Sequence, residues 1–210
     1  MIFHPIARLA EAGIDEILIV TGVDHLEDIV GLLESGEQWN LDFTYRVQQE
    51  AGGIAEALGL AESFAAGDDI TVILGDNIFN ENITEYVTQF EKQKSGARIM
   101  LKEVDDPERF GVPELEGNQI TKIIEKPDDP PSSYCVTGIY MYDSQVFDFI
   151  SSIDPSDRGE LEITDVNNLY IEHEQLQYNI FDSWWTDAGT FPSFYHANDL
   201  AREITYGMFE

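Results

Sequence analysis

Short apolar segments alternate with helical segments over the first half of this chain. Residues 16–22 and 70–74 are continuous apolar runs, typical of strands that are buried on both faces of a parallel sheet. Residues 24–33 and 53–66 carry their apolar side chains at helical spacing. Because strands alternating with helices form layered sheets, the sequence predicts an α/β fold with a doubly wound, Rossmann-like core.

The second half of the chain has a different pattern, in which strands follow one another with few long helices between them. The predicted strands of this half are residues 97–104, 111–115, 120–124, 134–142 and 176–181. The predicted helices are residues 83–94, 146–150, 165–174 and 192–208. Since no segment has the composition of a linker, we expect a single domain, residues 1–210, with lobes of about 1–104 and about 105–210.

The charge balance limits the possible partners. The chain has 41 Asp and Glu against 11 Lys and Arg, a formal net charge of −30. A phosphate backbone would be repelled by this charge, so we expect no nucleic-acid partner. The acidic residues are spread along the chain, which favours an acidic surface adapted to a high-salt cytoplasm. An unusually acidic protein from a low-salt cell is the alternative.

The cellular location is predicted from what the sequence contains. No apolar run approaches the roughly 20 residues that cross a bilayer, so we expect no membrane partner. The first residues lack the pattern of a secretory signal. The single cysteine, Cys135, cannot form an intramolecular disulfide and fits a buried, inert thiol. These features favour the cytoplasm.

Three segments that lie far apart in the sequence have the composition of one functional site. Asp76 follows an apolar strand, at the strand end where α/β sheets bind ligands. Glu125 and Lys126 end another strand and could anchor hydroxyl groups and a phosphate. Asp187 follows two tryptophans. Two carboxylates and a lysine in one cleft suit a divalent metal and a phosphorylated substrate.

Eight motifs in one order connect these segments to a known family. They are residues 47–48 (VQ), 53–57 (GIAEA), 74–79 (LGDNIF), 106–112 (DPERFGV), 125–127 (EKP), 134–140 (YCVTGIY), 158–165 (RGELEITD) and 185–190 (WTDAGT). In this order the chain resembles the sugar-1-phosphate nucleotidyltransferases from end to end, and the glucose-1-phosphate thymidylyltransferases most closely. One such motif alone would be weak evidence, whereas eight in register are specific.

The resemblance implies a mixed central sheet flanked by helices and a defined reaction. The sugar 1-phosphate attacks the α-phosphorus of a nucleoside triphosphate, here dTTP with glucose 1-phosphate, and pyrophosphate leaves. Positioning and charge neutralisation supply the rate in such transfers. The resemblance implies that Asp76 and Asp187 hold Mg²⁺, that Gln48 contacts the base, and that Gly53 allows close approach of the nucleotide.

Further positions match the sugar-phosphate side of the family's site. Lys126 matches the lysine that binds the phosphate, with Arg158 beside it at the site, although a surface salt bridge is the alternative for Arg158. The positions that match sugar contacts are Gly111, Glu125 and Val136. Trp185 could form the cleft wall or belong to the core. Phe110 stands where the family usually has tyrosine.

The chain departs from the family at its beginning. Family members open with a strand and a G-G-x-G-T-R-L loop that binds the triphosphate, whereas the first residues here match the helix that follows. A βα unit of roughly 30 residues is therefore expected to be absent. A misplaced start codon, a truncated gene or a second chain that supplies the unit would each explain this. We expect little or no transferase activity without it, and a gap between the strands at Ile17 and Val72.

Other functions remain open on the sequence alone. UTP or GTP could replace dTTP on the same fold. A non-catalytic paralogue that binds sugar phosphate or regulates a full-length enzyme is the alternative outside catalysis. Family enzymes are commonly homo-oligomers, so we expect self-association, with the terminal helix between subunits.

Overall fold

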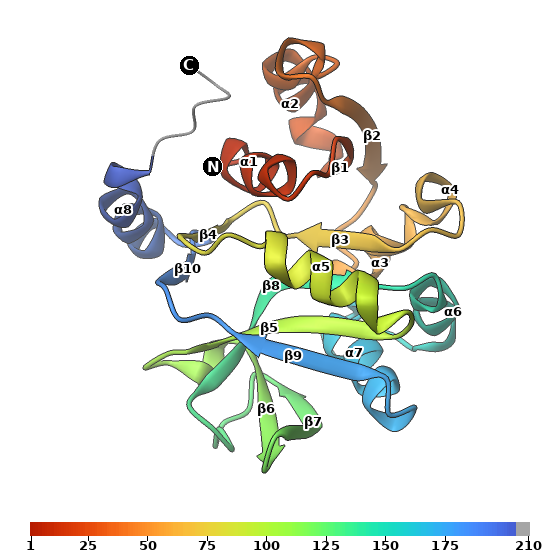
Figure 1. The fold of residues 1–210 in the computed structure, drawn as a ribbon, viewed down its shortest axis with the longest axis vertical. Coiled ribbons are helices and arrows are strands. Elements are labelled where there is room, and N and C mark those ends of the chain that lie inside the picture. Colours follow the sequence, from red (N-terminus) through yellow and green to blue (C-terminus); the bar gives the residue numbers. More distant parts are fainter. Residues whose placement is uncertain (205–210) are drawn as a thin grey trace.

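The computed structural model describes residues 1–204 as a mixed α/β fold (Figure 1). The helices are α1 (Phe3–Glu11), α2 (Leu26–Leu33), α3 (Ile54–Gly59), α4 (Glu62–Ala65), α5 (Thr84–Gln93), α6 (Gln145–Ser152), α7 (Ile163–Glu172) and α8 (Phe191–Leu200). The strands are β1 (Glu16–Gly22), β2 (Asp42–Gln48), β3 (Ile70–Ile73), β4 (Asn77–Phe79), β5 (Ala97–Glu103), β6 (Gly111–Glu116), β7 (Gln119–Glu125), β8 (Tyr134–Tyr142), β9 (Leu176–Ile180) and β10 (Trp185–Asp187). Short 3₁₀ turns connect several of them.

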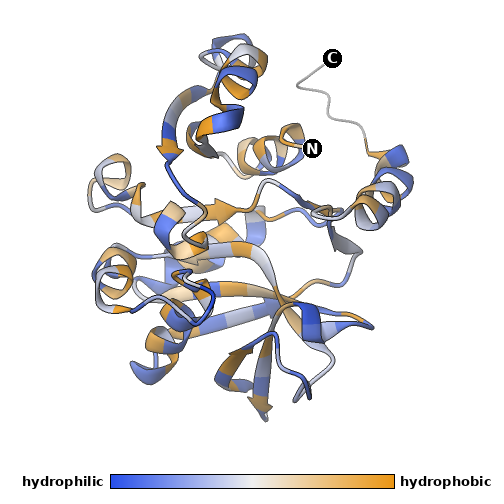
Figure 2. Cartoon of the chain, turned by 180° about the vertical axis from the view of Figure 1, so that it is seen from behind, coloured by the Kyte–Doolittle hydropathy of each residue, from blue (hydrophilic) through white to orange (hydrophobic). Residues whose placement is uncertain are grey.

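A four-stranded sheet in the order β3-β8-β5-β9 forms the centre of the fold. Strand β8 pairs antiparallel with both β3 and β5, and β5 pairs parallel with β9. The β8 segment is aromatic and β-branched, and every residue after Tyr134 is buried, as expected of the strand with neighbours on both edges. Figure 2 shows hydrophobic positions along these central strands and hydrophilic positions on the outer helix surfaces.

Three smaller strand pairs surround the central sheet. β1 and β2 pair in parallel, β6 and β7 form an antiparallel hairpin, and β4 pairs antiparallel with β10. The β1–β2 pair is not hydrogen-bonded to β3, and the two are separated by a cavity of about 420 Å³. This cavity is the gap that the sequence predicts between Ile17 and Val72.

Helices cover the sheet through two main apolar clusters. One joins α3, α6 and α7 to one face of β5 and β8. In it Tyr142 and Tyr170 are fully buried, and their stacked rings have centroids 5.6 Å apart. The other joins α1 to β1, β4 and the opposite face of the sheet, around Phe79 and Phe181. Among residues 1–204, no helix is long and apolar enough to cross a membrane.

The predicted α/β class is confirmed, and most predicted elements lie within two residues of the observed ones. The segment predicted as one helix over 53–66 is helical but divided into two helices, α3 and α4, by a turn at residues 60–61. The terminal helix predicted over 192–208 ends at Leu200, and residues 205–208 lie outside the described residues. Strand β3 was expected to be fully buried and is half-buried throughout, since it faces the cavity. The division into lobes near 104 stays a prediction.

Candidate active site

One cleft of about 280 Å³ brings together eight of the ten residues that the sequence predicts for the site. It lies between the β4–β10 pair, the β6–β7 hairpin, β8 and the start of α7. The predicted residues that line it are Asp76, Gly111, Glu125, Lys126, Val136, Arg158, Trp185 and Asp187. They come from six segments spread over more than a hundred residues of sequence, and the fold brings them together in one cleft.

The two predicted metal carboxylates converge because β4 pairs with β10. In that register Asn77 lies opposite Asp187, and the backbone N–H of Ala188 donates to the Asp76 carbonyl over 2.7 Å. A Cβ atom at Gly189 would lie 3.1 Å from Asp76 Oδ2 and 3.6 Å from Asp187 Oδ2. The absent side chain at Gly189 therefore leaves a small space bordered by both carboxylates.

This donor set fits magnesium. Mg²⁺ prefers hard oxygen ligands and usually binds through one or two carboxylates together with substrate phosphates. Within the described residues no group of three or more His, Cys, Asp or Glu side chains has the geometry of a complete metal site. Within residues 1–204 the candidate metal ligands are thus the two carboxylates of Asp76 and Asp187. Two protein ligands suit a metal ion whose other ligands come from a substrate.

Asn77 is a site residue whose role the sequence analysis missed. Its side chain is 2% exposed, and its Oδ1 accepts hydrogen bonds of 2.8 Å from both the Gly138 N–H and the Trp185 Nε1–H. Its Nδ2 donates to Asp76 Oδ1 over 2.9 Å. Asn77 therefore fixes the orientation of the Asp76 carboxylate and ties β8 and β10 to it. The signal was its place in the LGDNIF motif, which was quoted without a role for the asparagine.

Arg109 is a second residue that the sequence analysis missed. Its guanidinium donates to Asp106 over 2.8 Å and to both carboxylate oxygens of Asp187 over 3.2 Å. The hydrogen bond to Asp106, followed by the charge of Asp187, raises the pKa of Arg109 above its ordinary value. A cation that binds Asp187 therefore has to compete with this ion pair.

Two further cations, Lys126 and Arg158, line the cleft. Lys126 Nζ lies 3.5 Å from Glu125 Oε1, and its backbone adopts a left-handed φ of 43° while its N–H donates to the Phe110 carbonyl. Arg158 Nη2 lies 2.8 Å from Glu162 and 3.4 Å from Glu125. Both side chains are nearly half exposed, so they can reach a bound anion.

The surroundings of Arg158 are compatible with both sequence interpretations, a phosphate-binding residue and a surface salt bridge. Its hydrogen bond to Glu162 raises the pKa of the guanidinium, and Glu160 and Glu125 add to this effect. The residue is thus part of a salt-bridge cluster, and the same cluster borders the cleft. The carboxylates hold the guanidinium at the edge of the cleft. They do not use all five of its N–H donors, so some remain available to a ligand.

The cleft surface next to Lys126 and Arg158 is formed by Gly111, Glu125 and Thr164. Thr164 Oγ1 donates to Glu125 Oε2 over 2.6 Å, which orients the carboxylate. A Cβ at Gly111 would lie 3.1 Å from that hydroxyl and 3.6 Å from the carboxylate. The glycine therefore leaves room next to a carboxylate whose position is fixed. Thr164 was not singled out from the sequence.

Trp185 and Val136 form the buried wall of the cleft. Both are 8% exposed, and the Trp185 ring packs edge-to-face on Phe110 with centroids 5.5 Å apart. Trp185 belongs to an apolar core cluster and also lines the cleft, so its two predicted roles are compatible.

Gln48 and Gly53 do not line this cleft. Gln48 Nε2 donates to Glu56 Oε2 over 2.6 Å and to the Gly53 carbonyl over 3.1 Å. Gly53 has a φ of 98°, and a Cβ there would collide with the Leu161 carbonyl. Close packing of two backbone segments explains this glycine. Contact of either residue with a nucleotide stays a prediction.

Comparison with known proteins agrees with this geometry. The nucleotidyl transferase family profile matches residues 1–203. The chain belongs to this family. A glucose-1-phosphate thymidylyltransferase of Neisseria meningitidis is 36% identical over 208 residues, which are 97% of this chain and 72% of that protein. The low-salt glycan biosynthesis nucleotidyltransferase Agl11 of Haloferax volcanii is 38% identical over 203 residues. That alignment covers 95% of this chain and 57% of Agl11, so the chain spans little more than half of this relative.

Solved structures give the same result. A crystal structure of a putative glucose-1-phosphate thymidylyltransferase from Bacillus anthracis, in complex with sucrose, superposes with a TM-score of 0.94 at 53% identity. The match covers 98% of this chain and 84% of that one. A UDP-glucose pyrophosphorylase superposes with a TM-score of 0.83 at 22% identity, which shows a shared fold. The resemblance to sugar-1-phosphate nucleotidyltransferases is confirmed.

Proposed function

We propose that this cleft binds a sugar 1-phosphate and a nucleoside triphosphate and transfers the nucleotidyl group between them. The observation that carries the proposal is that Asp76 and Asp187 line the same cleft as Lys126 and Arg158. An oxygen of the sugar phosphate attacks the α-phosphorus, a new P–O bond forms, and the bond to pyrophosphate breaks. Pyrophosphate leaves with the bonding electrons.

The residues of the cleft divide this work. Lys126 and Arg158 hold the sugar phosphate, and Glu125, oriented by Thr164, accepts hydrogen bonds from sugar hydroxyls. Asp76, oriented by its hydrogen bond from Asn77, and Asp187 would hold Mg²⁺. When bound there, Mg²⁺ neutralises phosphate charge and orients the triphosphate. Because the reaction asks for little covalent chemistry from the protein, fixed positions of these groups account for most of the rate.

We propose dTTP and glucose 1-phosphate as the substrates, giving dTDP-glucose for nucleotide-sugar and polysaccharide synthesis. The names of the Neisseria and Bacillus relatives support this choice. Gln48 is proposed as the residue that contacts the base. It would have to release Glu56 to do so, because its amide now donates to that carboxylate. UTP and GTP are the competing nucleotides.

The test is formation of the product from labelled substrate. The protein is incubated with Mg²⁺, ¹³C-labelled glucose 1-phosphate and dTTP, UTP or GTP in separate reactions, and products are detected by mass spectrometry. We expect labelled dTDP-glucose above the level of an Asp187→Asn sample, and less product with UTP or GTP. Mass spectrometry is chosen because it detects the small amount of labelled product that slow turnover would give. Product of equal yield in the Asp187→Asn sample, or more product with UTP or GTP than with dTTP, contradicts the proposal.

Two further properties belong to the same proposal. We propose that the protein acts in the cytoplasm and that its acidic surface, with a formal net charge of −30, suits high salt. We also propose a homo-oligomer, because α8 exposes Phe191 and Tyr195 by 83% and 69%. Sedimentation velocity of wild type and a Phe191→Ser variant tests this, with a single monomer species in both as the contrary result.

A further inference from the structure

Arg109 places a positive charge on one of the two candidate metal ligands. Its Nη2 group lies 3.2 Å from both carboxylate oxygens of Asp187. Among residues 1–204, no other lysine or arginine forms an ion pair with Asp187 or with Asp76. Two carboxylates that border one small space repel each other unless a cation lies nearby. Arg109 therefore supplies, from within the chain, a charge that reduces this repulsion.

The guanidinium is held by two carboxylates, and its bond to Asp187 is the longer of the two. The 2.8 Å between Nη1 and Asp106 Oδ2 is typical of a charge-assisted hydrogen bond, whereas the 3.2 Å to Asp187 is longer than usual. Asp106 directly precedes the 3₁₀ turn Pro107–Arg109, so the shorter bond lies within the arginine's own turn. The contact with Asp187 is thus the one that can break while the guanidinium stays attached to its turn.

The surroundings of Arg109 allow its guanidinium to change partners. The side chain is 40% exposed, so solvent or a ligand can reach it. Its Cζ lies 5.0 Å from the centre of the Phe110 ring, a cation–π contact that does not involve Asp187. Because ion pairs of this exposure are weak, the loss of the Asp187 contact costs at most about a factor of five in an equilibrium constant.

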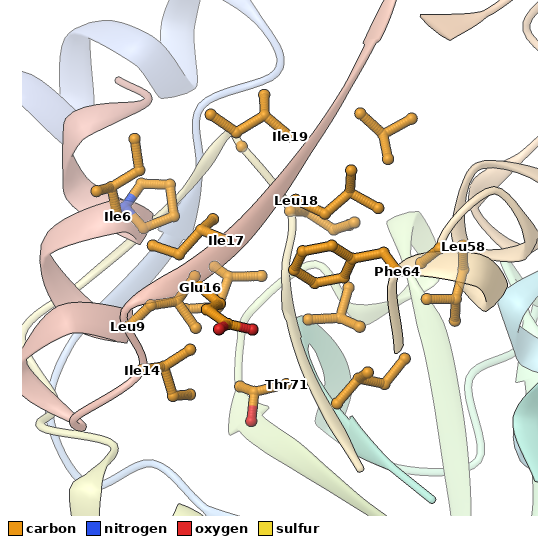
Figure 3. Close-up of a pocket in the computed structure, with 18 of the residues that line it drawn as sticks. Ile6, Leu9, Ile14, Glu16, Ile17, Leu18, Ile19, Leu58, Phe64 and Thr71 are labelled. Carbon is orange, nitrogen blue, oxygen red and sulfur yellow. The ribbon is translucent and has the colours of Figure 1, made fainter. Parts of the chain in front are cut away.

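The cleft also gathers positive charge in a chain that has little of it. Arg109, Lys126 and Arg158 line the cleft, and the whole chain has 11 Lys and Arg at a formal net charge of −30. Among the described residues, no lysine or arginine lines the larger cavity between β1 and β3. Figure 3 shows the Glu16 carboxylate among the aliphatic side chains of that cavity. The cleft is therefore the better place for a phosphate group, and Arg109 is at hand there.

We propose that Arg109 exchanges partners during ligand binding. It pairs with Asp187 while the cleft holds no ligand, and it turns Nη2 to a ligand phosphate once a divalent cation takes Asp187. The inference rests on the proposed function, in which Asp187 holds Mg²⁺ and the cleft binds phosphates. A phosphate that shares the cation with Asp187 lies next to the carboxylate that Arg109 has left. Asp106 keeps hold of Nη1, and the planar guanidinium suits phosphate oxygens.

The exchange couples the binding of the cation to the binding of the phosphate. Without phosphate, a cation has to displace Arg109 from Asp187, and the arginine gains no new partner. With phosphate in the cleft, the displaced guanidinium binds the phosphate. Phosphate should therefore tighten cation binding, and by linkage the cation should tighten phosphate binding by the same factor. The device favours a cleft that holds both ligands over a cleft that holds the cation alone.

The first test measures Mn²⁺ binding by electron paramagnetic resonance, with and without saturating glucose 1-phosphate. For wild type we expect glucose 1-phosphate to tighten Mn²⁺ binding at least about tenfold. In Arg109→Ala, Mn²⁺ alone should bind up to about fivefold more tightly, and the tightening by glucose 1-phosphate should be at least about fivefold smaller than in wild type. Arg202→Ala is the matched control, because Arg202 pairs with Asp199 at the same sequence spacing outside the cleft. It should behave as wild type does.

The second test follows the guanidinium itself in the ¹H–¹⁵N spectrum of the arginine side chains. The Arg109 signal is assigned as the one that is missing in Arg109→Lys, a variant that keeps the charge. We expect it to shift with Mg²⁺ and further with glucose 1-phosphate, and in Asp187→Asn it should not respond to Mg²⁺ alone. A second titration with inorganic pyrophosphate identifies the partner, since the phosphate that Arg109 contacts gives the larger shift.

Two results overturn the inference. An equal tightening of Mn²⁺ binding in wild type and Arg109→Ala shows that Arg109 takes no part in the coupling. An Arg109 signal that neither Mg²⁺ nor a phosphate shifts shows that the guanidinium stays on Asp187. If Asp187→Asn removes Mn²⁺ binding while either result holds, only the inference fails. If Asp187→Asn leaves Mn²⁺ binding unchanged, the proposed function fails together with it.

Discussion

Replacing Asn77 by alanine is expected to destabilise the protein strongly, although the change removes only one amide group. The substitution takes away the acceptor of two buried donors, the Gly138 N–H and the Trp185 Nε1–H, each 2.8 Å from Asn77 Oδ1. A buried donor that loses its acceptor costs about 1–3 kcal/mol. The two together lower the free energy of unfolding by about 2–6 kcal/mol, a large part of a typical total of about 5–15 kcal/mol.

The assay is equilibrium unfolding in urea, followed by tryptophan fluorescence and circular dichroism. Urea is preferred because guanidinium chloride is a salt and would screen the charge of −30 during the titration. Asn80→Ala is the matched control, since Asn80 is exposed three residues further along the same segment, and it should change stability by less than about 0.5 kcal/mol.

Two additional variants separate the contributions. Asn77→Asp keeps an acceptor for both donors and replaces the amide that donates to Asp76 by a second carboxylate, so it should disturb the Asp76 position more than the β8 contact. In a double-mutant cycle, Asn77→Ala and Trp185→Phe should show a coupling of about 0.5–3 kcal/mol. A loss below about 1 kcal/mol for Asn77→Ala, with no coupling to Trp185, refutes the reasoning.

Four further predictions concern charge and binding. Lys126→Ala should weaken glucose 1-phosphate binding about 10- to 100-fold by calorimetry and leave triphosphate binding nearly unchanged; an equal loss for both ligands would contradict its role. Arg109→Ala should tighten Mn²⁺ binding up to about fivefold, because the half-exposed ion pair with Asp187 no longer competes; weaker binding would count against this. The melting temperature should rise from 10 mM to 1 M KCl as the screening length falls from about 30 to 3 Å, and by more than in sucrose of equal osmolarity; a flat profile argues against salt adaptation. Burial, then Arg8, lowers the pKa of His4 to about 3, so the unfolded state takes up a proton below its ordinary value of 6.5 and the folded state does not. Stability should therefore fall by about 1.4 kcal/mol per pH unit below 6.5, and His4→Gln should flatten the slope, with an unchanged slope as the contrary result.

Much of the fold follows from local sequence pattern. Apolar runs and helical spacing predicted the α/β class and nearly all strands, because burial on one or both faces determines these patterns. The short strands β4 and β10 were not predicted, since three-residue strands have too little pattern of their own. Their pairing is decided by tertiary contacts such as the Asn77–Trp185 hydrogen bond, 108 residues apart in sequence.

The candidate site shows the same limit. The motifs predicted Asp76, Lys126 and Asp187, which the structure brings to one cleft. Arg109 was missed because its partner Asp187 is 78 residues away, and no local pattern signals that ion pair. Gly53 was assigned to nucleotide approach, whereas its observed neighbour is the Leu161 backbone. Motif resemblance thus selected residues that line one cleft, and packing decided what each residue contacts.

The most direct test of the central claim is whether a metal ion at Asp76 and Asp187 shares the cleft with the sugar phosphate. The measurement is the ³¹P relaxation of glucose 1-phosphate in the presence of protein, Mn²⁺ and the α,β-methylene analogue of dTTP. We expect strong broadening of the glucose 1-phosphate signal with wild type, and its loss with Asp187→Asn while glucose 1-phosphate still binds. Undiminished broadening with Asp187→Asn, or none with wild type, would contradict the account.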